Sequence, residues 1–139
     1  ARKPPFVFPV VGMNSSSQVS TDYQFEIDFL EAIRRRQPAD LPVLELLAGY
    51  LTRAGYLKEG LDIDLQIVSL DPQNPVSHYN LACSHALRDD FAKAMDCLRE
   101  ALKLGYDDFD WMRQDPDLEM LRQHNDIEEL MEPFLDSPS

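Results

Sequence analysis

A spacing of 34 residues constrains the fold of this chain more than any other feature of its sequence. Apolar or small residues recur at that separation in two consecutive segments, and so do two prolines. The pairs are Leu47 with Leu81, Ala48 with Ala82, Gly60 with Ala94, Ile67 with Ala101, Leu70 with Leu104 and Pro38 with Pro72. A fixed period of this size, with two helices in each unit, is typical of helical solenoids. The period predicts an all-α chain of helical hairpins.

Capping residues divide each unit into helices. The expected helices run over about 22–36, 41–54 and 57–70, from 75 to the turn at Asp89, and from there to Gly105. The expected N-terminal caps are Thr21 in a capping box with Gln24, Asp40, Asn74 before Pro75, and Asp89 or Asp90. Gly55 and Gly105 offer the left-handed residue that often closes a helix. Each repeat is therefore expected to be two helices joined by a short turn.

Small residues stand at positions where a helical core would normally have bulky ones. Ala82 lies in the first helix of the second repeat, and Ala94 and Ala101 lie in its second helix. Two helices approach closely only where the side chains at their crossing are small, and overpacking such a crossing costs about 1–3 kcal/mol. We therefore expect these alanines to be buried where helices cross.

This pattern resembles that of the tetratricopeptide repeat (TPR) family. The matching positions are Leu81-Ala82, Ala94 and Ala101 in one unit and Leu47-Ala48 and Pro72 in the unit before it. The earlier unit departs from the pattern at Gly60 and at Ile67, where the family has alanine. The resemblance implies a short right-handed α-solenoid of antiparallel helix hairpins.

The last part of the sequence resembles the segment that closes some bacterial arrays of the same family. The matching residues are Trp111, Asp115, Pro116, Asp117, Leu118, Leu121 and Arg122. Asn125 with Glu128 fits a capping box for a final helix, and the acidic segment is expected to cover the apolar face of the last hairpin. The expected organisation is an extended arm 1–21, a TPR-like domain 22–134 (half repeat 22–40, repeats 41–74 and 75–108, capping helices 109–134) and a tail 135–139.

The resemblance also implies a binding surface, because the first helix of each repeat lines the concave face of such a solenoid. The residues placed there are Glu45, Leu46, Gly49 and Arg53 from one repeat and Tyr79, Asn80, Cys83 and Leu87 from the next. This face suits an extended peptide; the alternatives are that it is solvated or filled by the chain itself. A clamp for the terminal carboxylate of heat-shock chaperones is rejected, because Glu45 stands where that clamp needs a lysine.

Residues 1–21 form a second distinctive segment. Its prolines favour an extended backbone, and its apolar side chains would form an exposed patch in water. The apolar residues expected to dock are Phe6, Val7, Phe8 and Val10. We expect this arm to dock on the helical domain, either in the same chain or across a homodimer. The alternative is a disordered leader.

The charge of the chain limits the classes of partner. The formal net charge is −12, and because residues 1–21 carry Arg2 and Lys3 without any acid, residues 22–139 carry −14. This excess argues against binding nucleic acid or an anionic membrane and favours a protein or peptide partner that is basic or apolar. Prolines interrupt the apolar run near the N-terminus, which is unlike a secretory leader, so we expect a cytoplasmic protein.

Residue types that carry chemistry are present but not in the spacing that catalysis or metal binding needs. His78, Cys83 and His85 do not form the tight ligand pairs of a zinc site, and Cys83 and Cys97 do not form a CxxC pair. The sequence therefore predicts no catalytic residues, no metal and no cofactor. It predicts a non-catalytic protein-interaction module; the alternative is a self-association protein, or a small secretion-type chaperone, that uses the apolar arm.

Overall fold

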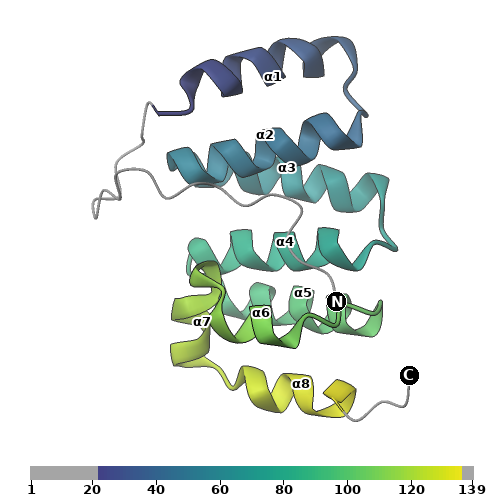
Figure 1. Cartoon of the computed structure of the whole chain (residues 1–139), viewed down its shortest axis with the longest axis vertical. Coiled ribbons are helices and arrows are strands. Elements are labelled where there is room, and N and C mark those ends of the chain that lie inside the picture. The colour runs from purple at the N-terminus through teal and green to yellow at the C-terminus, as the bar shows by residue number, and fades with distance from the viewer. Residues whose placement is uncertain (1–21, 136–139) are drawn as a thin grey trace. The chain divides into compact units, whose positions relative to one another are not determined.

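The computed structural model describes residues 22–135, and every regular element within them is helical. Figure 1 shows the order of the elements. They are α1 (Gln24–Arg36), α2 (Leu41–Ala54), α3 (Leu57–Leu70), α4 (Pro75–Leu87), α5 (Phe91–Lys103), α6 (Phe109–Gln114), the 3₁₀ turn η1 (Pro116–Leu118), α7 (Glu119–His124) and α8 (Ile127–Leu135). The all-α prediction is confirmed for this part of the chain. The arm, with Phe6, Val7, Phe8 and Val10, lies outside the described residues.

The described residues form two compact units, 22–71 and 72–135, and each unit has its own core. Within each unit, consecutive helices pack in adjacent pairs, α2 with α3 and α4 with α5. The hairpins expected from the 34-residue period are therefore present. The right-handed solenoid, which concerns the placement of one unit against the other, stays a prediction.

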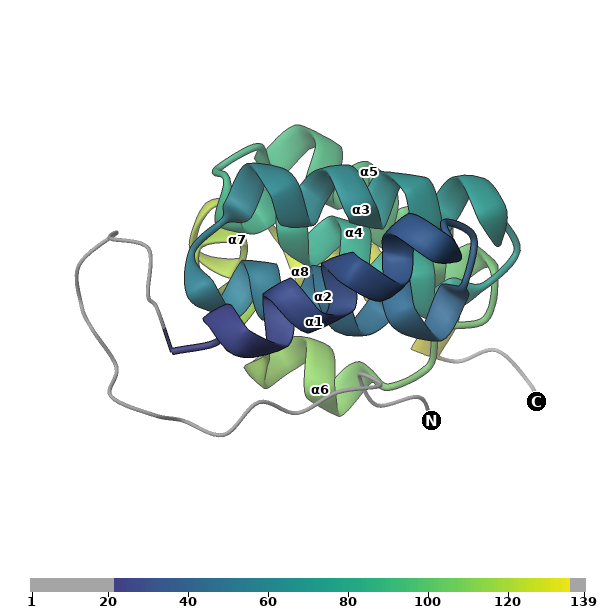
Figure 2. The same cartoon turned by 90° about the horizontal axis from the view of Figure 1, so that it is seen from above.

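The first unit consists of the α2–α3 hairpin and α1, which packs along α2 (Figures 1 and 2). Its core joins apolar residues of all three helices. They are Ile27 and Leu30 of α1, Leu44, Leu47, Ala48, Leu51 and Ala54 of α2, and Ile63 and Ile67 of α3. The side-chain amide of Gln66 also donates to the carbonyl oxygen of Pro38 at 3.1 Å, which fastens α3 to the turn between α1 and α2.

The ends of the helices largely follow the expected caps. The carboxylate of Asp40 accepts a hydrogen bond from the backbone N–H of Val43 at 3.2 Å, and Gly55 closes α2 with a φ of 97°. At its N-terminal end, α1 begins at Gln24 after Tyr23, which makes no side-chain cap bond. Thr21 lies outside the described residues.

A glycine within α3 allows this helix to approach α2 closely. A Cβ atom added at Gly60 would lie 2.6 Å from the hydroxyl oxygen of Thr52, which is closer than real Cβ atoms come to other heavy atoms. That hydroxyl donates to the carbonyl oxygen of Ala48 at 2.9 Å. Because threonine is branched at Cβ and stiff at χ1, its oxygen cannot move away without losing this bond.

Gly60→Ala should therefore cost at least about 1 kcal/mol more stability in the wild-type background than in a Thr52→Ala background. The second background removes the oxygen that the new methyl group meets, so only the better helix propensity of alanine remains there. Urea unfolding of the two single variants and the double variant measures the difference. Equal effects of Gly60→Ala in both backgrounds would show that the close approach is not limiting.

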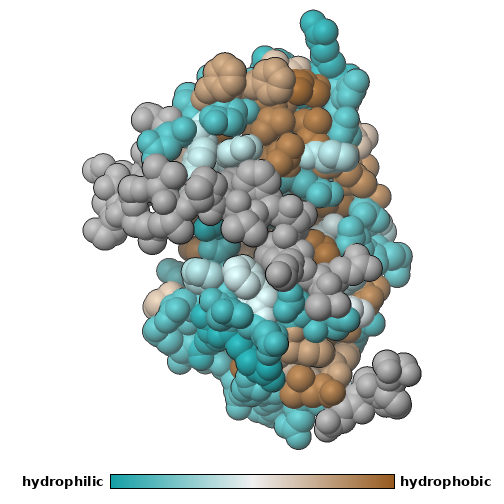
Figure 3. Space-filling view, viewed as in Figure 1, coloured by the Kyte–Doolittle hydropathy of each residue, from teal (hydrophilic) through white to brown (hydrophobic). Residues whose placement is uncertain are grey.

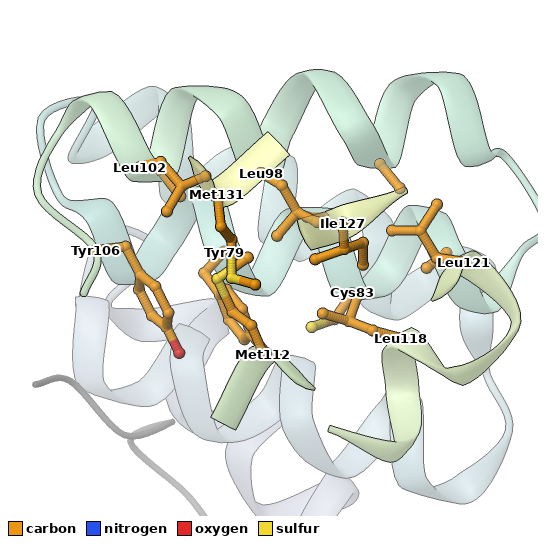
Figure 4. Close-up of a cluster of buried hydrophobic side chains, with 14 residues drawn as sticks. Tyr79, Cys83, Leu98, Leu102, Tyr106, Met112, Leu118, Leu121, Ile127 and Met131 are labelled. Atoms are coloured by element: carbon orange, nitrogen blue, oxygen red, sulfur yellow. The ribbon is translucent and has the colours of Figure 1, made fainter. Parts of the chain in front are cut away.

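The second unit is built around the α4–α5 hairpin, which η1, α7 and α8 contact. Figure 4 shows its core, in which Tyr79 and Cys83 of α4 lie among apolar side chains from α5 and from the segments that follow it. Ala82, Ala94 and Ala101 belong to the same core and are 0% exposed. The expectation that these small residues are buried is confirmed.

Caps in this unit also follow the sequence, with one correction. Asn74 accepts from the backbone N–H of Val76 at 3.0 Å, and Asp90, rather than Asp89, accepts from that of Lys93 at 3.3 Å. The final helix is capped by Asp126, which accepts from the N–H of Glu129 at 2.9 Å. The prediction of Asn125 is wrong, because α8 begins at Ile127 and the residue directly before it, Asp126, supplies the cap.

Candidate functional site

The predicted binding residues fall into two groups, one in each compact unit. Glu45, Leu46, Gly49 and Arg53 lie on α2, and Tyr79, Asn80, Cys83 and Leu87 lie on α4. Since α2 belongs to residues 22–71 and α4 to residues 72–135, each group forms a face of its own helix.

On α4, the chain itself covers two of the predicted residues. Tyr79 is 1% exposed, and its ring stacks on that of Tyr106 with centroids 4.2 Å apart and planes at 2°. Its hydroxyl donates to a carboxylate oxygen of Asp115 at 2.6 Å. The thiol of Cys83, which is 7% exposed, lies 3.7 Å from the same oxygen. Tyr79 and Cys83 are therefore not accessible to a partner in this structure, whereas Asn80 and Leu87 are half-buried.

Asp115 is the residue that joins the C-terminal segment to α4. It is 4% exposed, and its other carboxylate oxygen accepts from the backbone N–H of Asp117 at 2.9 Å, which forms the turn η1. Burial raises the pKa of Asp115, and the hydrogen bond from Tyr79 opposes this effect. Because a buried carboxylate needs donors to remain charged, Tyr79 and the turn stabilise each other.

Arg122, which comes after η1 in the sequence, bonds back to the same segment. Its guanidinium Nη1 donates to the carbonyl oxygen of Asp115 at 2.8 Å and to that of Met112 at 3.0 Å. These two oxygens lie at or near the end of α6, where carbonyl groups have no partner within the helix. Residues of the Asp-Pro-Asp-Leu and Leu-Arg pattern in the sequence thus make the contacts that hold η1 beside α4.

The face of α2 has a different character, because its predicted residues remain at least partly accessible. Glu45, Leu46 and Gly49 are half-buried and Arg53 is exposed. Residues 45, 49 and 53 recur every four positions, which places them along one side of a helix. Leu46 supplies an apolar side chain beside this row, and Gly49 adds no side chain to it.

The carboxyl group of Glu45 is electrostatically unusual. Burial is the main cause that raises its pKa, and the negative charge of Asp71 raises it further. A carboxylate that has lost part of its hydration beside a second acid is stabilised by a nearby cation. This face therefore favours a positively charged group over a negative one.

The remaining candidate groups for chemistry include Cys97, which packs against the core of residues 72–135, and His78, which bonds to the backbone. Burial raises the pKa of Cys97 to about 11, with smaller contributions from Asp96 and Asp90. Cys97 is thus protonated and weakly nucleophilic at neutral pH. The ring Nε2 of His78 lies 2.8 Å from the carbonyl oxygen of Pro72. Residues 22–135 contain no group of three or more His, Cys, Asp or Glu that could hold a metal ion.

Within residues 22–135, no helix has both the length and the apolar character needed to cross a membrane.

Comparison with known proteins shows a short similarity to a curated protein. No protein-family model matches the sequence. A stretch of 62 residues is 42% identical to a chloroplastic protein from Arabidopsis thaliana, and it covers 45% of this chain and 18% of that protein. The chain thus spans less than a fifth of the length of this relative. The similarity to the tetratricopeptide repeat family stays a prediction from the sequence.

Proposed function

We propose that this chain is a non-catalytic protein-interaction module, and that its α2 face binds a protein segment carrying a basic side chain next to an apolar one. The observation that supports this proposal is the state of Glu45, whose carboxyl group is partly desolvated beside Asp71. A lysine or arginine from a partner would compensate the negative charge of Glu45. Leu46 would contact the neighbouring apolar side chain, and the charge of −14 on residues 22–139 would attract a basic segment.

An interaction role also agrees with the state of the other titratable groups. Burial raises the pKa values of Tyr79, Tyr106 and Cys97. The first two side chains are within the core of residues 72–135, and Cys97 packs against it. Groups whose ionised form is suppressed by burial in a packed core are poor nucleophiles or bases. These phenols and this thiol therefore support packing, which favours binding over catalysis.

The proposal is tested with peptides selected from a random peptide library displayed on phage, with the full chain as bait. We expect the selected peptides to be basic and apolar, and Glu45→Gln to weaken their binding about tenfold, which corresponds to about 1.4 kcal/mol. Glu59→Gln is the matched control, because Glu59 is an exposed acid of the same unit on α3. Equal binding by the wild type and Glu45→Gln, measured by calorimetry, would contradict the proposal.

The pH dependence of binding follows from the raised pKa of Glu45. As the pH falls through this raised value, Glu45 becomes protonated before an ordinary glutamate does and loses its attraction for a cation. We expect the affinity for a basic peptide to decrease as the pH falls from neutral into the acidic range where Glu45 is protonated, and this decrease to be smaller in Glu45→Gln. Fluorescence anisotropy of a labelled peptide over this range measures both curves. Identical curves would show that Glu45 is not at the binding site.

The expected compartment is the cytoplasm, and the alternative is the chloroplast, which the name of the Arabidopsis relative gives for that protein. Microscopy of a fluorescently tagged full-length protein distinguishes the two.

A further inference from the structure

The outer face of α1 is apolar and exposed. Phe25 and Phe29 are 78% and 58% exposed, and their rings stack with centroids 6.4 Å apart. Ile27 and Leu30, on the opposite side of the helix, are 5% and 6% exposed and belong to the core with α2. Figure 3 shows apolar side chains gathered at the surface over α1, at the top of the view. The helix thus has one apolar side in the core and a second one at the surface.

The exposed side has the spacing of a helix-pairing seam. Phe25, Phe29, Ala32 and Arg36 follow one another at intervals of four, three and four residues, and all four are exposed. Intervals of four and three residues place these side chains in one stripe along the helix, as at the a and d positions of a coiled coil. A second helix can pack against such a stripe. Leaving the apolar surface of two phenylalanine rings in water is unfavourable. Burying these rings against another surface would therefore lower the free energy.

The distribution of charge along α1 determines the direction in which a second helix could pack on its exposed side. The acids Glu26, Asp28 and Glu31 all precede the bases Arg34, Arg35 and Arg36, so the helix has an acidic first half and a basic last turn. A second α1 in the antiparallel direction would place its basic end beside the acidic end of the first. A parallel arrangement would place like charges together. The opposite directions of the two helix dipoles also favour the antiparallel pair.

We propose that two copies of this chain associate through α1, antiparallel and related by a two-fold axis near Leu30 and Glu31. In such a pair, Phe29 lies opposite Ala32 of the second copy, so a large side chain meets a small one. Asp28 lies near Arg35 of the second copy, and two-fold symmetry makes each of these contacts occur twice. This surface is distinct from the α2 face proposed for the partner segment.

The association is expected to be weak and reversible. A single helix pair lies at the small end of specific interfaces, below about 1,200 Å² of total buried area, and exposed ion pairs are individually weak. The dimer should therefore form with increasing protein concentration and dissociate as salt screens the charges.

Sedimentation velocity of the full chain over a wide concentration range tests the proposal. We expect a monomer–dimer equilibrium that Phe29→Asp weakens at least tenfold. Met120→Asp is the matched control, because Met120 is an apolar residue of comparable exposure, 47%, on α7; it should leave the equilibrium unchanged. Circular dichroism of each variant checks that its helices are retained. A chain that remains monomeric at all concentrations would overturn the proposal.

The antiparallel direction is tested by exchanging charges. Arg35→Asp should weaken the dimer about tenfold by placing an acid near Asp28 of the second copy, and adding Asp28→Arg should restore it. Failure of the double variant to recover would overturn the antiparallel arrangement. The alternative occupant of this face is the arm, which Phe6→Asp with Phe8→Asp would disturb. A dimer lost in that variant but retained in Phe29→Asp would overturn pairing through α1.

Discussion

Replacing Ala94 with leucine is expected to destabilise residues 72–135 by about 3 kcal/mol, at the upper end of the usual cost of overpacking a core. Ala94 is 0% exposed and lies in one core with Ala82, Leu98 and Ala101, which are also 0% exposed. The isobutyl group of leucine has no free volume to occupy there, because protein cores are packed as densely as organic crystals. Either α4 and α5 must separate or neighbouring side chains must leave their preferred rotamers.

Urea unfolding followed by the fluorescence of Trp111 measures this effect. Trp111 is the only tryptophan of the chain and packs against the core of residues 72–135, so its signal reports on this unit. Ala92→Leu is the matched control, because Ala92 is exposed on the same helix and the substitution adds the same atoms without burying them. Equal midpoints for Ala94→Leu and Ala92→Leu would contradict a close helix crossing.

Tyr79→Phe is expected to cost about 2 kcal/mol at neutral pH, within the range for a hydrogen bond to a charged group. The substitution keeps the ring stacked on Tyr106 and removes only the donor to Asp115. The buried carboxylate then loses its shortest hydrogen bond. In an Asp115→Asn background, the same substitution should cost less, about 1 kcal/mol, because the acceptor is neutral.

The pH dependence of this cost follows from the raised pKa of Asp115, whose first cause is burial. A carboxyl group with a raised pKa in the folded state favours folding fully below the unfolded pKa and loses that contribution as the pH rises through the folded pKa. Removing the donor raises the folded pKa further. The cost of Tyr79→Phe should therefore be largest at neutral pH and decrease as Asp115 becomes protonated. An equal cost at neutral pH and at a pH acidic enough to protonate Asp115 would show that the carboxylate is not the group concerned.

Much of the hairpin architecture was predictable because its signals are local in the sequence. A cap such as Asp40 or Asn74 acts on a backbone N–H two or three residues away, and the repeat fixes which helices follow one another. The burial of Ala82 and Ala94 followed from the same register, since a small residue at a crossing is a requirement of close packing.

The relation between α4 and the C-terminal segment was not predictable in the same way. Tyr79 and Asp115 are 36 residues apart, and helical periodicity says which residues share a side of α4 but not which later segment covers that side. The Asp-Pro-Asp-Leu pattern indicated a cap, yet it carried no signal for a tyrosine partner. The accessible character of the α2 face and the exposed side of α1 likewise depend on tertiary packing.

The separation of the apolar interior into two cores has a consequence for how the protein loses its structure. A segment as short as 22–71 buries a smaller share of its surface than a larger domain, so it has less to oppose the chain entropy gained on melting. Binding of another molecule to α1 or α2 adds stability to this segment by mass action. The concentration of the protein in the cell would thus affect the temperature at which α1, α2 and α3 melt.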